Sequence, residues 1–190
     1  MYYWSTMLVI SCHADTGFKS HRLRRLPGGA VEGHLDNFAG CHAVMQAYFS
    51  GRMDFDHVRI ELTWGEEVGL LGAKELVGSL NPKDLVVVVD VTGTPTENDF
   101  VIEKCADPKV RGFLNKTLKG MKYDLFEDCP DPIANSDESD VYVGKCPHTF
   151  FLGIPCTGGD YNAGVVRCRQ ASLDGVAEAL SRIAAKFREF

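Results

Sequence analysis

The stretch LVVVVD, residues 85–90, is an unbroken apolar and β-branched run that ends on an acid. Such runs are typical of strands that are covered on both faces, as in the parallel sheets of α/β proteins. A second run, MLVI at residues 7–10, leads in the same way to Cys12-His13. Between them, residues 57–64 alternate polar and apolar side chains and end just before Glu66-Glu67, which predicts a strand with one better-buried face.

Helical patterns alternate with these predicted strands. Helices are expected over residues 36–49, 69–80 and 108–118, and in a C-terminal segment that Ser172 would cap. Shorter strands are expected at residues 100–103, 123–126, 149–152 and 165–166. The alternation predicts a mainly parallel or mixed sheet between helical layers, with the functional loops at the carboxyl ends of the strands.

Composition sets the class of protein. A chain of 190 residues with 45% hydrophobic side chains is expected to form a single domain over residues 1–190. The formal net charge of −6 offers no basic field for a phosphate backbone, which argues against nucleic acid as a partner. No apolar run approaches the length of a membrane span, so no membrane partner is expected.

The cysteines bear on the compartment. The chain has seven cysteines and no CxxC pair, and several of them lie in apolar runs. This pattern predicts buried free thiols rather than a disulfide framework, and therefore a reducing, cytoplasmic location.

Acidic and imidazole side chains stand where the predicted strands give way to loops. Hard carboxylate oxygens mixed with one imidazole suit a zinc-class divalent ion. His13 is a candidate ligand with Asp15 orienting its ring, and Asp36 is a candidate bridge between two ions. One glutamate of the Glu66-Glu67 pair would bind metal while the other acts as general base.

Each of these positions also has a purely structural interpretation. Asp36 is of a residue type favoured at helix N-caps, and a lone His-x-Asp pattern usually carries no function. Glu66-Glu67 could be a solvated turn, and Asp90 could be neutralised by an ordinary partner. The set as a whole could even be surface charge on an unrelated α/β domain, but that requires several spaced coincidences.

The motifs resemble those of the zinc-dependent exopeptidase superfamily, which includes bacterial leucyl aminopeptidases, deblocking aminopeptidases and glutaminyl cyclases. The resemblance rests on CHAD at 12–15, GHLDNFAG at 33–40, WGEEVGLLGA at 64–73, Val89-Asp90, and SDE at 136–138 before GIP at 153–155. It implies a three-layer α/β/α sandwich with a mixed, mainly parallel sheet. It also implies removal of an N-terminal residue from a peptide, or hydrolysis of a related small amide.

Residue by residue, the resemblance implies the following roles. His13, Asp36 and Asp90 would surround one zinc ion, and Asp36 and Glu67 would reach a second. Glu66 would be the general base, and Asp15 would support His13.

The chain departs from this superfamily pattern in two ways. Relatives carry a last histidine ligand just before the C-terminal helix, and Gln170 stands there in QASLD, residues 170–174. An amide oxygen is a poor zinc ligand, which predicts a weakened or empty second zinc site unless His148 substitutes for it. The early position of His13 suggests a version trimmed at its N-terminus, whose uncovered sheet edge would favour a homo-oligomer.

The sequence therefore favours a metal-dependent peptidase or amidohydrolase, most similar to an aminopeptidase, that acts on small peptides or amides. The alternative is a catalytically impaired relative that keeps the pocket for binding or assembly. Aminopeptidase, carboxypeptidase and deacylase activities all remain open at this level.

Overall fold

The sheet is organised around β5 (Leu85–Thr92), whose residues are all buried. In the computed structural model, which describes residues 6–134 and 136–190, β5 lies between β1 (Leu8–His13) and β8 (Thr149–Thr157). Both neighbours run parallel to β5, and β4 (Val58–Thr63) pairs in parallel with the other side of β1. The carboxyl ends of β1, β4 and β5 therefore meet at one edge of the sheet.

β8 is the strand at which the sheet branches. Along its middle it pairs antiparallel with β6 (Phe100–Glu103), which in turn pairs in parallel with β7 (Tyr123–Leu125). Its last residues pair antiparallel with β9 (Val166–Cys168), and the sheet continues through β3 (Val31–Gly33) to β2 (Leu23–Arg25). The sheet is mixed, with a parallel centre.

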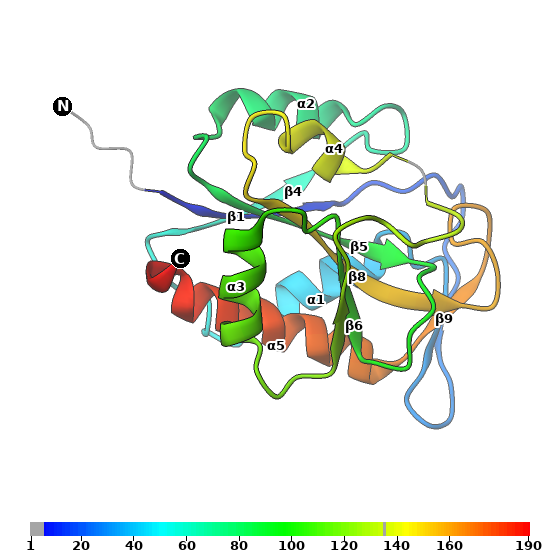
Figure 1. The fold of residues 1–190 in the computed structure, drawn as a ribbon. Helices are drawn as coiled ribbons and strands as arrows, with labels where there is room; N and C mark the ends of the chain where they lie inside the picture. The colour runs from blue at the N-terminus through cyan, green and yellow to red at the C-terminus, as the bar shows by residue number, and fades with distance from the viewer. Residues whose placement is uncertain (1–5, 135) are drawn as a thin grey trace.

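Helices cover both faces of this sheet (Figure 1). One layer contains α1 (Phe38–Phe49), α3 (Pro108–Thr117) and α5 (Gln170–Lys186), and the other contains α2 (Leu71–Leu76) and α4 (Glu138–Tyr142). Alternate side chains of β5 point to the two layers, with Val87 and Val89 in the larger core and Val86 and Val88 in the smaller one. The expected α/β/α sandwich is confirmed, because only a strand covered on both faces can bury every residue of a valine run.

The boundaries differ from expectation in several places. The helix expected over residues 69–80 ends at Leu76 and continues only as a 3₁₀ turn, Val77–Ser79. The C-terminal helix begins at Gln170, after Arg169, which makes no side-chain capping bond. Ser172 therefore does not cap this helix but lies within its first turn, where its hydroxyl is buried without a hydrogen-bond partner among the described residues. α4, β2 and β3 were not predicted. They are three to five residues long, and their sequences ESDVY, LRR and VEG contain no run of apolar residues like those that marked the short strands β6 and β9.

Two further expectations can be compared with the structure. All seven cysteines are free, and five of them are buried, as the sequence predicted. None of the helices in the described part of the chain is long and apolar enough to cross a membrane.

Candidate metal centre

Three side chains from three elements converge at the carboxyl edge of the sheet. His13 ends β1, Asp90 lies near the end of β5, and Asp36 stands just before α1. The Nε2 atom of His13 is 3.1 Å from Asp36 Oδ1 and 3.1 Å from Asp90 Oδ2, and all three residues are buried. One potential ligand atom from each lies within 4.8 Å of the others. The parallel strands thus bring together residues that are far apart in the sequence.

This cluster fits a divalent cation. Asp36 Oδ1 is buried and makes no hydrogen bond to a described residue, although it lies close to the imidazole. Asp36 and Asp90 share the single imidazole nitrogen of His13 as their ionic partner, and a metal ion held between the three side chains would balance both carboxylates. One imidazole nitrogen and two carboxylates are a donor set that zinc accepts.

Helix capping does not account for Asp36. The residue that caps α1 is Asn37, whose side-chain oxygen accepts from Gly40 N at 2.9 Å. Its amide nitrogen donates to Val89 O at 2.8 Å, which ties the start of α1 to β5. The interpretation of Asp36 as a simple N-cap is therefore wrong, and its carboxylate is free to face the cavity.

The charge balance in the cluster is strongly perturbed. Burial by itself would lower the pKa of His13, but the nearby carboxylates of Asp90 and Asp36 outweigh it and raise the pKa to about 12. Burial raises the pKa of Asp90 to about 7, against the lowering effect of His13. Without a cation, the imidazole must stay charged to balance the acids around it.

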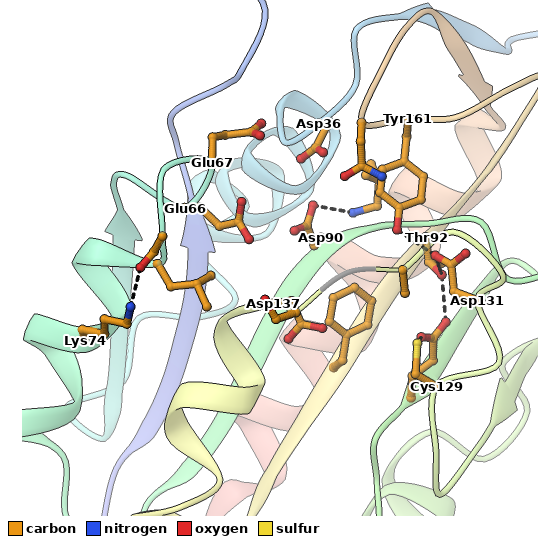
Figure 2. A pocket seen from close by; sticks show the side chains of 18 residues that line it. Asp36, Glu66, Glu67, Lys74, Asp90, Thr92, Cys129, Asp131, Asp137 and Tyr161 are labelled. Carbon is orange, nitrogen blue, oxygen red and sulfur yellow. Dashed lines mark hydrogen bonds between the residues drawn. The ribbon is translucent and has the colours of Figure 1, made fainter.

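Glu66 and Glu67 occupy the loop after β4 and turn their carboxylates toward Asp36 and Asp90 (Figure 2). Burial raises the pKa of the half-buried Glu66 to about 8, and the charges of Asp90 and Asp36 add to the rise. Burial also raises the pKa of Glu67, although its Oε1 accepts from Gly17 N at 2.9 Å. Neither glutamate forms an ion pair with a lysine or arginine of the described chain. Glu67 is exposed, so solvent can balance its charge, whereas Glu66 is partly buried and faces the other acids of the cavity.

Asp15 lies beside the cluster without joining it. Its Oδ1 is 3.6 Å from His13 Nδ1, which is too long for a hydrogen bond, and it accepts from the backbone N–H of Glu66 at 3.3 Å. Asp15 therefore connects the loop that carries Glu66 to the end of β1.

The four carboxylates open into a cavity of about 380 Å³. The cavity is strongly acidic, since its walls also include Glu103, Asp131 and Asp137, whereas Lys74 is the one lysine or arginine among the described lining residues. Lys74 does not neutralise an acid, because its ammonium donates to the backbone oxygen of Gly69 at 2.8 Å (Figure 2).

Comparison with known families decides the identity of the chain. Residues 3–144, about three quarters of the chain, match the sequence profile of peptidase family M28. The chain belongs to peptidase family M28. No curated protein sequence matches this M28 chain.

Solved structures share the fold of this M28 chain at low sequence identity. The PhTET1-12s dodecamer aligns with a TM-score of 0.71 and 16% identity over 86% of the chain and 53% of its own length. An aminopeptidase from the archaeon Desulfurococcus kamchatkensis gives 0.69 and 17%, covering 86% of the chain and 51% of its own. The Pyrococcus horikoshii TET1 peptidase gives 0.68 and 18%, covering 88% and 53%. The M28 chain thus spans about half the length of these structures.

Gln170 is not among the residues that line the carboxylate cavity of the M28 chain. It opens α5, and its amide nitrogen donates to Asp174 Oδ1 at 3.0 Å. Its side chain lines a separate cavity of about 330 Å³ with Leu35 and Phe38, and its buried Oε1 has no hydrogen-bond partner among the described residues. Its side chain therefore opens into a different cavity from the one that Asp36 and Asp90 line.

His148 cannot replace a missing ligand, so that suggestion is wrong. It stands just before β8, at the amino end of the strand, and its Nδ1 atom pairs with Asp107. It lines a cavity with Lys109 and Phe190 instead of the carboxylate cavity. Because β8 runs parallel to β5, its amino end lies at the opposite edge of the sheet from Asp90.

Several lining residues of the cavity were missed by sequence reasoning. Asp131 Oδ2 accepts from Tyr161 Oη at 2.8 Å and from Gly93 N at 2.7 Å. Buried Glu103, at the end of β6, accepts from Thr92 Oγ1 at 2.9 Å (Figure 2). Asp131 and Tyr161 come from loops without periodicity, so no local pattern could have marked them, whereas Glu103 at a strand end was a usable signal.

Proposed function

We propose that this M28 chain carries the active site of a metal-dependent, aminopeptidase-like hydrolase of small peptides or related amides. The observation that carries the proposal is the buried convergence of His13, Asp36 and Asp90, two of which line the same cavity as Glu66 and Glu67. Family membership and the aminopeptidase titles of similar structures support the same class of reaction.

His13, Asp36 and Asp90 would hold one zinc ion, and Asp36 and Glu67 would reach a second. Zinc bound there would supply a Lewis acid for the substrate carbonyl and would lower the pKa of a water. Asp36 fits the bridging role because its carboxylate lies against His13 and also lines the cavity that Glu66 and Glu67 line.

Glu66 would act as the general base. It is half-buried in the cavity, and burial raises its pKa toward neutrality, the range in which a carboxylate can both take up and release a proton. It would take a proton from the attacking water and return it to the leaving nitrogen. Asp15 would be a positioning residue, since its bond to Glu66 N fixes the loop next to the His13 ring.

The substitution Glu66→Gln tests this proposal. We expect it to lower the turnover of an N-terminal residue from a small peptide panel by about 10²- to 10⁴-fold, because the proton acceptor is lost. Metal content, measured by plasma mass spectrometry on the same samples, should stay at the wild-type level. Full turnover in the Glu66→Gln chain would refute the assignment of the base.

A second candidate is a catalytically impaired relative that binds peptides or serves in assembly. Gln170 favours it, because the structure places this amide in a separate cavity. Wild-type protein reloaded with zinc discriminates between the candidates: binding of panel peptides without turnover would support the impaired relative, and turnover would exclude it.

Self-association and location complete the proposal. PhTET1-12s is a dodecamer, and the Pyrococcus horikoshii TET1 peptidase can assemble into a tetrahedron or a large octahedral shell, which supports a homo-oligomer for this chain as well. The seven free cysteines support a reducing, cytoplasmic compartment.

A further inference from the structure

The outer edge of β4 has no partner strand in the described part of the chain. Leu8 N donates to His57 O and Ala14 N donates to Thr63 O, so the odd-numbered residues of β4 direct their backbone groups at β1. Since these directions alternate along a strand, Ile60 and Leu62 direct their N–H and C=O groups outward. The outward N–H of Val58 already donates to Phe55 O, at 2.9 Å.

The α1 side of this edge is apolar and open. A cavity of about 400 Å³ lies there, and its walls include Val58, Ile60, Leu62 and Tyr48. Leu62 is 46% exposed and Tyr48 is 50% exposed, and the neighbouring Phe49 reaches 78%. A contiguous apolar surface of this kind usually marks a contact with another molecule.

The opposite face of the edge carries one charge of each sign. Arg59 and Glu61 are two residues apart, so their side chains lie on the same face of β4, where they pair with each other. Their side chains remain 36% and 32% exposed, which leaves both able to meet a second partner.

We propose that β4 pairs antiparallel with β4 of a second copy of this chain, about a two-fold axis at Ile60. Ile60 of each copy would then donate to Ile60 of the other, and Leu62 N–H would donate to the carbonyl of Val58. Arg59 of each copy would lie opposite Glu61 of the other, at a non-hydrogen-bonded position where side chains come closest. This inference specifies the surface of the proposed homo-oligomer and is independent of the proposed hydrolysis.

The charges of Arg59 and Glu61 favour a second copy of this chain as the partner, and they fix the register in which the two β4 strands pair. Charges on an edge strand commonly prevent pairing, but here the two signs are complementary under a two-fold axis. Moving the axis one position, to Arg59 or to Glu61, would place that side chain opposite its own copy and leave like charges facing each other. A slip that pairs odd with even residues would turn the apolar side chains to the wrong face.

Charge reversal on the edge tests the proposal. By sedimentation velocity, we expect wild-type chain to form dimers. Arg59→Glu and Glu61→Arg, each alone, should weaken the dimer by about tenfold or more, because like charges then face each other. Mixing the two variants should restore dimers, since each position then sets a glutamate opposite an arginine. Lys119→Glu is the matched control for Arg59→Glu, because it makes the same change of charge at an exposed residue away from β4.

Three results would overturn the inference. A monomeric wild-type chain would mean that the edge is left for another protein or for further residues of a longer chain. If neither charge reversal weakens the dimer, the contact between the copies lies elsewhere. If Lys119→Glu weakens the dimer as much as Arg59→Glu does, the effect comes from the net charge of the chain and not from pairing at β4. Zinc binding measured on the same variants keeps this outcome separate from the proposed function, because the metal cluster does not include Arg59 or Glu61.

Discussion

At the scale of single residues, steric fit explains the spacing of Asp36, Asn37 and Gly40 in the sequence DNFAG, residues 36–40. A Cβ atom added to Gly40 would lie 2.1 Å from Asn37 Oδ1, far inside contact distance. The same Asn37 side chain caps α1 and bonds to Val89 O, so it has no free direction in which to move. Packing therefore requires a glycine at position 40. Because Asn37 is held in place, the preceding residue, Asp36, is also held at the cavity.

Gly40→Ala should therefore lower the free energy of unfolding by about 2 kcal/mol or more, through the lost cap and local overpacking. Urea denaturation of the variant and wild type measures this difference. Gly112→Ala is the control: Gly112 lies in α3 with open space around it, so the added methyl group should stabilise the chain by about 0.5–1 kcal/mol. Equal stability of the two variants would show that Asn37 can move aside.

At the scale of elements, a charge cluster joins α5 to the turn that follows α1. Glu178 in α5 accepts from Arg52 at 2.5 Å and from Arg182 at 2.8 Å. The hydrogen bond from Arg52 is the largest of the effects that lower the pKa of Glu178 to about 2. Because the folded pKa lies below the ordinary value of 4.5, this cluster stabilises the protein above that value, and the stabilisation is lost as the pH falls toward about 2.

Glu178→Gln should cost about 0.5 kcal/mol at neutral pH, a small value because the cluster is partly solvated. The difference in the free energy of unfolding between Glu178→Gln and wild type should fall to zero as the pH approaches about 2, the pKa of Glu178 in the folded state. Urea denaturation over a pH series checks the trend. Glu75→Gln is the control, since Glu75 is exposed and forms no ion pair among the described residues; a difference that persists unchanged into acid would contradict the assignment.

At the scale of the whole molecule, the cavity couples metal binding to stability. His13 at the end of β1, Asp90 in β5 and Asp36 just before α1 come together beside the loop after β4 that carries Glu66 and Glu67, so a bound ion would join separate parts of the fold. A ligand that binds only the folded state stabilises it by mass action.

Zinc at about a hundredfold excess over its dissociation constant should add about 2.7 kcal/mol, or roughly 5–10 °C in melting temperature for a chain of this size. Asp36→Ala should abolish this rise, whereas Glu97→Ala, which changes an exposed acid outside the cavity, should keep it. Scanning calorimetry with and without zinc measures the effect. An unchanged zinc response in Asp36→Ala would remove Asp36 from the proposed site.

The local sequence by itself determined the elements that are long or buried on both faces. Hydrophobic patterns predict three of these elements: the strand β5 with its valine run, the strand that leads to His13, and the helix after Asp36. The order of the predicted strands and helices indicates a mainly parallel or mixed sheet between helical layers. The acids at strand ends were also visible, because parallel strands bring their carboxyl ends to one edge.

Only the tertiary structure decided what those residues meet. It showed that Asn37 instead of Asp36 caps the N-terminus of α1. It also placed His148 at the end of the sheet opposite to the carboxylate cavity, and it placed Gln170 in the lining of a separate cavity. It also added Asp131 and Tyr161 to the carboxylate cavity and left β4 at an open edge. The physical reason is that periodicity records which face of an element is buried, whereas distances between elements depend on strand order and direction, which local patterns do not encode.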